Sequence, residues 1–318
     1  MKLLDLFSGI GGFHLGLEQS GFKFDWVGFS EIDKYANKQY KRRFPNATEL
    51  GDITTIQPED LPNDITILCG GFPCQAFSIA GKRQGFNDTR GTLFFEIARI
   101  LRYFKQIKKP IPYFVLENVK GLLNHDNGQT FATIYKVLTE IGYTIECQLL
   151  NTKWFLPQSR ERIYIVGHIG KRGRAKIFPI GEDAKIPRKK CDRPLPTLTA
   201  NDWKGASKQR ASIIVKSNLK QIGTIGKDSE ATRVYDSSGI SRTIKNGGGM
   251  GAKTGLYKVN ENIRRLTPIE CERLQGFPDG WTEGQSDTQR YKQLGNAVSV
   301  PVIKAIGDKL WRLTQKNT

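Results

Sequence analysis

The sequence contains few residues of the kinds that form cross-links or bind metals. Its 318 residues include five cysteines and three histidines. The cysteines are odd in number and dispersed, and no two of them form a C-x-x-C pair; they are Cys69, Cys74, Cys147, Cys191 and Cys271. This usage argues against a disulfide framework and against a zinc site. We therefore expect a protein of a reducing compartment that binds no metal.

Long apolar runs are also absent. No run reaches the roughly 18 residues that a membrane-spanning helix needs. Residues 1–9 lack a cleavage-site pattern and lead directly into a strand and a turn, so we do not expect a signal peptide. These absences predict a cytoplasmic protein without a membrane-spanning segment.

Acidic residues are scarce beside basic ones. Only 31 Asp and Glu oppose 49 Lys and Arg, which leaves a formal net charge of +18. An excess of this size favours a nucleic-acid partner, and a solvated basic face is the alternative. The length suits one large domain, alone or with a smaller one.

Hydrophobic periodicity predicts alternating strands and helices over the first half of the chain. Strands are expected at 3–7, 24–29, 65–69, 113–119, 143–150 and 162–166, and helices after residue 12 and at 35–44, 92–105 and 129–141. Such alternation predicts a mostly parallel sheet with helices on both faces, that is, a doubly wound α/β fold.

The character of the sequence changes near residue 170. Short alternating runs among Gly, Ser, Thr, Asn and Lys continue to residue 262 and predict a small β-rich domain. Thr267-Pro268-Ile269-Glu270 has the pattern of a capping box, and residues 299–313 predict a final amphipathic helix packed on the first domain. The expected domains are therefore 1–169, 170–262 and a return segment, 263–318.

The loop after strand 65–69, Gly70 to Ser78, carries a candidate nucleophile. Its Pro-Cys pair places the Cys74 thiol beyond the carboxyl end of a strand, where open α/β sheets bind ligands. A lone cysteine is more often a small buried apolar residue. The basic residues of the following loop, Lys82, Arg83 and Arg90, favour the thiolate instead. Cys69 ends an apolar strand, and we expect it in the core.

Residues 5–12, Asp-Leu-Phe-Ser-Gly-Ile-Gly-Gly, close one strand and open a helix. Glycines there let a ligand approach the backbone, and free N–H groups at a helix start suit an anion. Glu31 ends the next strand, where a carboxylate can accept hydrogen bonds from ribose hydroxyls. His14 stands where G-x-G-x-x-G has its third glycine. The pattern favours an adenosine-bearing cofactor over a tight packing turn, and Asp52 is either an acceptor for adenine or an ordinary turn residue.

Six segments in this order resemble the motifs of the C5-cytosine DNA methyltransferases. They are residues 5–13, 71–75, 117–119, 158–162, 265–271 and 293–298. Together they span the chain except for 170–262, and the Cys74 region with residues 85–95 is most similar to the bacterial HhaI-type enzymes. The resemblance implies a Rossmann-like methyltransferase domain and a smaller target-recognition domain.

The resemblance also implies a mechanism. S-adenosyl-L-methionine would supply a methyl group to C5 of a cytosine flipped out of duplex DNA. Cys74 would attack C6 of that base. Glu117 would contact N3 and the exocyclic amine, and Arg160 and Arg162 would reach O2 and orient Cys74 and Glu117.

Binding residues are assigned by the same resemblance. The cofactor pocket would contain Phe7, Gly9, Gly11, Gly12, Glu31, Ile32, Asp52, Pro73, Leu93 and Asn296. DNA would contact Gln75, Ser78, Ala80, Glu230, Arg233 and Thr243. Ala80 stands where the family has serine and Glu230 where glutamine is familiar, so Glu230 is either a guanine-binding residue or a solvated loop acid. Arg233 and Thr243 would contact phosphates, which position the DNA without specifying its sequence.

The resemblance predicts a sequence-specific modification methylase of a bacterial restriction–modification system. It would act as a monomer on double-stranded DNA in the nucleoid, with a cognate restriction endonuclease acting on the same site. A tRNA-directed relative with the same Cys74 chemistry and a non-catalytic DNA-binding regulator are the alternatives. An NAD-dependent oxidoreductase is least favoured, because the glycine spacing does not fit.

Overall fold

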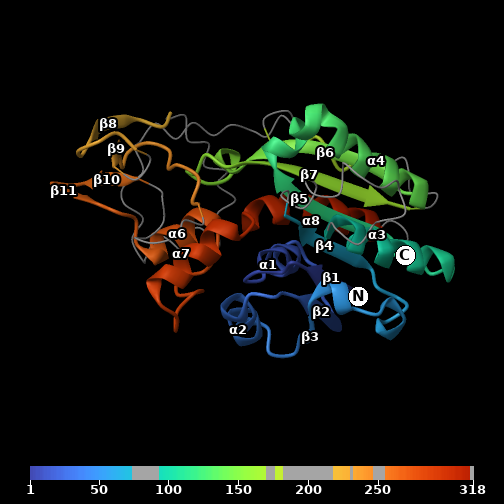
Figure 1. Cartoon of the computed structure of the whole chain (residues 1–318). Coiled ribbons are helices and arrows are strands. Elements are labelled where there is room, and N and C mark those ends of the chain that lie inside the picture. The colour runs from blue at the N-terminus through green and yellow to red at the C-terminus, as the bar shows by residue number, and fades with distance from the viewer. Residues whose placement is uncertain (74–92, 170–175, 182–217, 230–231, 246–254, 316–318) are drawn as a thin grey trace. The chain divides into compact units, whose positions relative to one another are not determined.

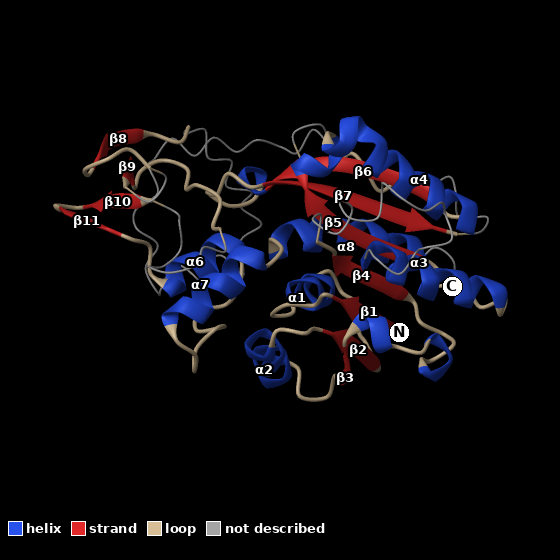
Figure 2. Cartoon of the chain, in the orientation of Figure 1, coloured by secondary structure: helices blue, strands red, loops and turns tan. Residues whose placement is uncertain are grey.

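The computed structural model describes residues 1–73, 93–169, 176–181, 218–229, 232–245 and 255–315 (Figure 1). These residues form two compact units. The first comprises Met1–Leu150, Glu161–Ile180 and Ile303–Thr318, and the second comprises Asn151–Arg160 and Gly181–Val302. Each unit has its own sheet, and Figure 2 shows strands and helices in both.

The first unit contains a seven-stranded sheet in the order β3-β2-β1-β4-β5-β7-β6. Its strands are β1 (Lys2–Leu6), β2 (Trp26–Ser30), β3 (Thr48–Gly51), β4 (Ile67–Gly71), β5 (Tyr113–Val119), β6 (Thr144–Asn151) and β7 (Glu161–His168). Neighbours from β3 to β5 pair in parallel, and β7 pairs antiparallel with β5. The predicted mostly parallel sheet is therefore confirmed.

Helices cover both faces of this sheet. They are α1 (Gly12–Gln19), α2 (Lys34–Arg43), α3 (Leu93–Gln106), α4 (Gln129–Ile141) and α8 (Val300–Gln315). Side chains of α3 and α4 share one core cluster with Leu4, Leu68 and Phe114. Because side chains alternate along a strand, Asp5 points to the opposite face, where Tyr40 of α2 contacts it.

The final helix packs in the first unit, as predicted. Ile303, Ile306 and Leu310 are fully buried. The Trp311 ring meets the Phe22 ring edge-on at 5.1 Å between centroids. The apolar residues of the amphipathic pattern at 299–313 therefore form a stripe that packs in the core.

The second unit has a four-stranded sheet in the order β11-β10-β9-β8. The strands are β8 (Gln221–Thr224), β9 (Arg233–Asp236), β10 (Leu256–Val259) and β11 (Asn262–Arg264). The unit also holds α6 (Pro268–Gln275) and α7 (Asp287–Asn296). Thr267 and Glu270 form the predicted capping box at the start of α6. A small separate sheet is thus present, with β8, β9 and β10 inside the expected β-rich segment and β11 crossing its end.

The division into units differs from the expected domains in two places. Helices α6 and α7 belong to the second unit, whereas the return segment 263–318 was expected to complete the first, and residues 151–160 also join the second. The reason is long-range hydrogen bonding, since the buried Gln158 side chain donates to Leu274 O at 3.1 Å. Periodicity in the sequence carries no signal of such a contact. The boundaries 1–169, 170–262 and 263–318 remain a prediction about functional domains.

One further strand was not predicted. Strand β3 has only four residues, two exposed and two half-buried, and its sequence lacks an apolar pattern. Within the described residues, no helix has the length and apolar character needed to cross a bilayer.

Candidate active site

The loop between β1 and α1 has an unusual backbone. Phe7, Gly9 and Gly11 have φ values of 53°, 55° and 84°, in the left-handed region that favours glycine. A Cβ on Gly11 would lie 2.4 Å from the Phe44 ring, whereas one on Gly9 would meet nothing within 4 Å. Gly11 therefore permits close packing against α2, and Gly9 leaves one side of the loop open to a ligand.

Glu31 is held next to this loop at the end of β2. The Gly9 N–H donates to Glu31 Oε2 at 2.9 Å, and the Asp33 N–H donates to Oε1 at 2.8 Å. A carboxylate oxygen accepts more than one hydrogen bond, so both can still receive hydroxyl donors. Ile32, the next residue, is 77% exposed and offers an apolar surface beside the carboxylate.

Asp52 follows β3 at the same edge of the sheet. Its side chain accepts from the Thr54 N–H at 2.9 Å and caps the short helix η1 (Ile53–Thr55). Arg99 of α3 supports this turn, because its Nη2 donates to Ile53 O at 3.3 Å and to Ile56 O at 2.9 Å. Arg99 was not predicted as a site residue, because no local sequence pattern distinguishes it.

The remaining predicted cofactor residues of the first unit lie at the ends of its elements. Pro73 is exposed and follows β4, Leu93 is half-buried at the start of α3, and Gly12 begins α1. Since β1 to β4 run parallel, the residues after their carboxyl ends share one edge of the sheet. Open α/β sheets bind ligands at that edge.

A buried polar cluster lies beneath the loop. Asp5 is fully buried and accepts from Tyr40 Oη at 3.1 Å and from Cys69 Sγ at 3.3 Å. The His14 ring lies 3.1 Å from Tyr40 Oη and stacks on Phe44 at 3.8 Å. His14, where the sequence departs from a glycine pattern, thus packs α1 against α2.

Burial controls the chemistry of this cluster. Removal from water raises the pKa of Asp5 to about 7. Burial also raises the pKa of the Cys69 thiol well above its usual range. Cys69 is therefore a core residue, as expected from its strand.

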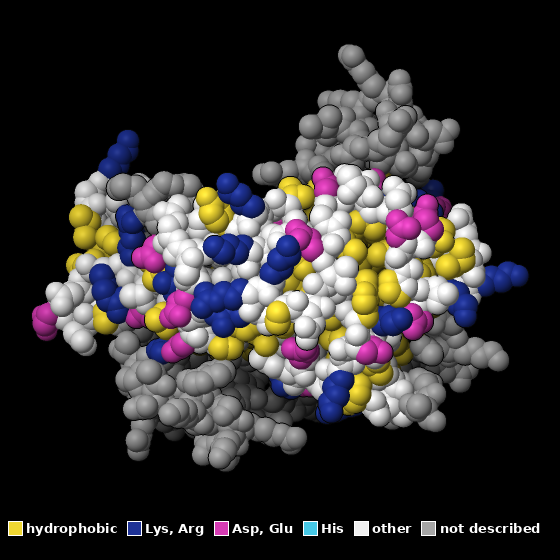
Figure 3. All heavy atoms as spheres, turned by 90° about the horizontal axis from the view of Figure 1, so that it is seen from below, with side chains coloured by type: hydrophobic (Ala, Val, Ile, Leu, Met, Phe, Trp, Pro, Cys, Tyr) yellow, Lys and Arg dark blue, Asp and Glu magenta, His cyan; other side chains and the backbone are white. Residues whose placement is uncertain are grey.

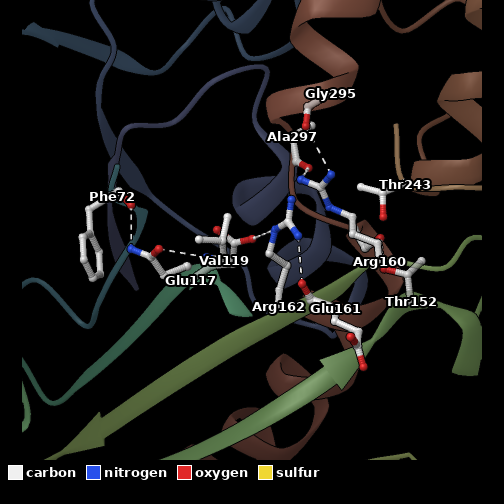
Figure 4. A network of polar contacts seen from close by, with 12 residues as sticks. Phe72, Glu117, Val119, Thr152, Arg160, Glu161, Arg162, Thr243, Gly295 and Ala297 are labelled. Carbon is white, nitrogen blue, oxygen red and sulfur yellow. Dashed lines mark hydrogen bonds and ion pairs between the residues drawn. The ribbon is translucent and has the colours of Figure 1, made fainter. Parts of the chain in front are cut away.

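Glu117 and Arg162 form an ion pair on neighbouring strands. Glu117 is buried near the end of β5, and Arg162 Nε lies 3.0 Å from its Oε1. Antiparallel pairing of β5 with β7 places Val119 opposite Arg162. Figure 4 shows the two side chains pointing toward each other, with Arg162 Nη1 also donating to Glu161 O at 2.8 Å. The predicted acid and one predicted arginine are thus brought together.

Asn118 holds the segment that leads toward Cys74 through hydrogen bonds. Its buried Nδ2 donates to Phe72 O at 2.8 Å, while the Val119 N–H donates to its Oδ1 at 2.8 Å. A Cβ on Gly71 would lie 3.2 Å from Glu117 Oε2, so Gly71 admits the carboxylate beside β4. A polar residue ending an apolar strand was the available signal for Asn118.

Arg160 lies in the second unit and is 3% exposed. Its Nη1 donates to Ile244 O and Gly295 O, both at 3.2 Å, and its Nη2 donates to Ala297 O at 2.9 Å. Asn296, the last residue of α7, is exposed between two of these acceptors. The Arg160 guanidinium, predicted as a site residue, thus donates hydrogen bonds to three backbone carbonyls of the second unit.

Two predicted DNA contacts belong to the second unit. Arg233 forms an exposed pair with Asp228, with Nε to Oδ1 at 2.8 Å and Nη2 to Oδ2 at 3.1 Å. The Thr243 hydroxyl donates to Ser159 O. The other predicted residues, Cys74, Gln75, Ser78, Ala80 and Glu230, lie outside the described residues.

The surface view in Figure 3 shows how charge is distributed on one face. Lys and Arg side chains of the described residues are scattered there among acidic and apolar ones. On this face, the basic side chains of the described residues therefore form no continuous basic surface.

Comparisons with known proteins find similarity over nearly the whole chain. The family model described as C-5 cytosine-specific DNA methylase matches residues 1–312. Type II methyltransferase M1.ScrFI of Lactococcus lactis subsp. cremoris is 43% identical, over 99% of this chain and 79% of that protein. Type II methyltransferase M.HhaI of Haemophilus parahaemolyticus is 38% identical, over 96% and 93% of the two chains.

A solved structure agrees in fold. The crystal structure of S. pombe Dnmt2 methyltransferase covers 100% of this chain and 99% of its own, with a TM-score of 0.69 at 21% identity. An identity this low shows the fold alone. The family match over nearly the whole chain, the two relatives and the six ordered motifs lead to one conclusion: the chain is an enzyme that belongs to the C-5 cytosine-specific DNA methylases.

Proposed function

We propose that the protein transfers a methyl group from S-adenosylmethionine to C5 of one cytosine in a short duplex DNA sequence. By similarity to type II methyltransferases, we further propose that this methylation protects DNA from a restriction endonuclease acting on the same site. The observation that carries the proposal is the Glu117–Arg162 pair, in which the buried Glu117 carboxylate near the end of β5 meets the half-buried Arg162 of β7. Glu117 lies beside the segment leading toward Cys74.

The residues of the first unit fit S-adenosylmethionine. Glu31 offers carboxylate oxygens for the ribose hydroxyls, and Asp52 offers one for the adenine amino group. The exposed Ile32 side chain suits a face of the purine ring, since exposed large apolar groups favour an apolar partner. We propose that the other contacts come from the remaining expected residues: Phe7, Gly9, Gly11, Gly12, Pro73, Leu93 and Asn296.

The proposed chemistry begins at the cytosine ring. The Cys74 thiolate forms a bond to C6, and the electron pair moves to C5. When bound, S-adenosylmethionine would supply an electrophilic methyl group to C5, with its methyl–sulfonium bond breaking to leave S-adenosylhomocysteine. Loss of the C5 proton to a base then returns an electron pair to the ring, and the C6–S bond breaks to restore the thiolate.

Glu117 and Arg162 act on the opposite edge of the base in this proposal. Negative charge builds on the ring when sulfur adds to C6, and a proton held between Glu117 and N3 offsets it. Arg162 Nε fixes the carboxylate at 3.0 Å, which presets its direction before the base arrives. The remaining guanidinium donors suit the O2 oxygen of cytosine.

Duplex DNA is the proposed substrate, and the enzyme is proposed to act as a monomer. Sequence reading in the major groove is assigned to residues between about 195 and 260. Gln75, Ser78, Ala80 and Glu230 would lie at the flipped base and its partner guanine, and Arg233 and Thr243 at phosphates. The cognate endonuclease needs no direct contact with this protein.

The deciding experiment is covalent trapping on DNA containing 5-fluorocytosine. Fluorine at C5 cannot leave as a proton, so attack at C6 leaves a stable adduct after methyl transfer. We expect an adduct that depends on S-adenosylmethionine and maps to Cys74, and sequencing the trapped duplex gives the recognition site.

Matched variants make the result specific. Cys74→Ser should form no adduct while binding DNA within about tenfold of wild type. Cys147→Ser removes an exposed cysteine and should trap normally. DNA binding without any adduct would favour the non-catalytic regulator, and preferential methylation of tRNA would favour the RNA-directed enzyme.

A further inference from the structure

We infer that Arg160 is a positioning residue that couples cofactor binding to DNA binding within the second unit. This inference rests on the proposed function, since it takes Asn296 as a cofactor contact and Thr243 as a phosphate contact. It concerns two short segments. One is Ser241–Ile244, called the 241–244 segment, and the other is Gly295–Ala297, called the α7 end.

A single buried guanidinium binds both segments. Arg160 donates to Ile244 O of the 241–244 segment and to Gly295 O and Ala297 O of the α7 end, as Figure 4 shows for the α7 end. The donors of a guanidinium lie in one rigid plane. The carbonyls that share it therefore hold fixed positions relative to one another.

The 241–244 segment is bound to the Arg160 loop at several other points. The Ser159 N–H donates to Ser241 O and the Ser241 N–H to Pro157 O, both at 2.8 Å. The Thr243 hydroxyl donates to Ser159 O. Thr243 thus touches the residue before Arg160 and precedes Ile244, which Arg160 binds.

The α7 end is held in a similar way. Gln275 is fully buried, and its Nε2 donates to Leu294 O at 2.8 Å and to Ala297 O at 3.4 Å. Ser299 donates to Gln275 Oε1 at 3.1 Å. The exposed Asn296 side chain therefore projects from a turn whose flanking carbonyls are both bound by Arg160.

The cofactor and the DNA would therefore both act on segments that are bound to the same Arg160 guanidinium. A buried carbonyl that loses its hydrogen-bond donor costs free energy. Both segments should therefore stay bound to the Arg160 guanidinium and move together rather than independently. A cofactor that orders Asn296 then also orders Ile244 and Thr243, and DNA bound at Thr243 orders the α7 end. The coupling must be equal in both directions.

The test measures the coupling factor. The dissociation constant of the duplex recovered by trapping is measured by fluorescence anisotropy with and without saturating S-adenosylhomocysteine. Calorimetry measures S-adenosylhomocysteine binding with and without the duplex. For wild type we expect each ligand to tighten the other by about tenfold, within the usual range of coupling between sites.

Two substitutions separate coupling from simple structural support. Arg160→Lys keeps the charge but loses the planar donor set, and we expect the coupling factor to fall to about twofold or less. Thr243→Val removes the hydroxyl bound to Ser159 and should also lower it, whereas Thr243→Ser keeps the hydroxyl and should retain it. The Thr243 pair decides the matter if Arg160→Lys does not fold.

The outcomes distinguish this inference from the proposed function. Failure of the wild-type protein to bind both ligands would overturn the proposed function. Wild-type coupling that persists unchanged in Arg160→Lys, or in Thr243→Val where the lysine variant is unfolded, would overturn only the coupling role. A purely structural role would lower the melting temperature or both affinities but leave their ratio unchanged.

Discussion

Burial separates the cysteines by their chemistry. Cys69 is fully buried, donates to Asp5 at 3.3 Å and has a raised pKa, so it stays a thiol. Cys271 is also fully buried, and removal from water raises its pKa too. Thiolate is the reactive form of cysteine, and burial prevents Cys69 and Cys271 from ionising to it. The same reasoning makes Asp5 a titrating group in the neutral range.

Asp5→Asn should change how stability depends on pH. The folded protein holds the Asp5 proton up to about pH 7, whereas the unfolded chain releases it near pH 3.8. The Asp5 contribution to the free energy of unfolding is therefore full below about pH 4 and is lost as pH rises to 7. Wild type should lose roughly 3 kcal/mol more than Asp5→Asn between pH 5 and 8.

Urea unfolding of both proteins across this pH range measures the difference. Other titrating groups are common to the two proteins and cancel in the comparison. Parallel stability curves for wild type and Asp5→Asn would show that Asp5 does not titrate in this range.

Arg162→Lys should reduce turnover with little effect on cofactor binding. Lysine preserves a positive charge near Glu117 but lacks the rigid fork that presets the carboxylate. We expect kcat to fall by about 10- to 100-fold, up to the lower end of acid–base contributions, while S-adenosylhomocysteine binds within about twofold of wild type. Single-turnover methylation and calorimetry provide the two values.

Lys120→Met is the matched control for Arg162→Lys. Lys120 forms an ion pair with Glu161 at 3.0 Å, but both side chains are exposed. Exposed pairs contribute little, so kcat should stay near wild type. Equal losses in the two variants would mean that the Glu117–Arg162 pair has no special part in turnover.

Among the elements, helix α3 links two predicted parts of the cofactor site. Leu93 is its first residue, and Arg99, two turns later, donates to two carbonyls of the Asp52 turn. Arg99 Nε also lies 2.7 Å from Glu96, which holds the side chain in place. The turn therefore depends on a helix that follows it by some forty residues in the chain.

Arg99→Met should weaken cofactor binding through Asp52. Without the guanidinium, the Ile53 and Ile56 carbonyls lose a donor and the turn loosens. We expect the dissociation constant of S-adenosylhomocysteine to rise by about five- to tenfold, equivalent to roughly one hydrogen bond, with kcat changed less than twofold.

Arg102→Met tests the same helix surface without touching the turn. Arg99 and Arg102 line one surface pocket together with Pro58, Phe95 and Tyr103. Arg102→Met should leave the dissociation constant unchanged within about twofold. A rise as large as that of Arg99→Met would attribute the effect to loss of charge from the pocket.

At the scale of the whole molecule, the net charge of +18 governs the proposed encounter with DNA. Neutralising phosphates releases counterions, so affinity should fall steeply with salt. Arg233, expected at a phosphate, pairs with Asp228 across an exposed surface. Such a pair is weak enough for a phosphate to replace the carboxylate.

Arg233→Gln should therefore lower the salt dependence of DNA binding. The slope of log affinity against log salt should fall in magnitude by about one, whatever the DNA sequence. Anisotropy titrations between about 50 and 200 mM salt measure the slope. Lys136→Gln on α4 removes the same charge from the first unit and should leave the slope unchanged; identical slopes for wild type and Arg233→Gln would remove Arg233 from the phosphate contacts.

The elements of the first unit were largely predictable because each has a strong local pattern. Residues 113–119 are a buried apolar strand and 129–141 a helix at the expected bounds. The four-residue β3 and the antiparallel direction of β7 were not predicted, since neither depends on local periodicity. The acid Glu117 and the loop 5–12 were identifiable from motif residues. Tyr40, which contacts Asp5, and Arg99, which donates to the Asp52 turn, were not.

The sequence by itself determined the family, the alternation that builds the sheet and the identity of the chemical groups at the ends of its strands. Those properties follow from residue type and short-range spacing. Tertiary structure alone decided that Asp5 is buried against Tyr40 and that Arg160 binds carbonyls from Ile244, Gly295 and Ala297. These contacts join residues far apart in the chain, and only folding sets their burial, direction and hydrogen-bond partners.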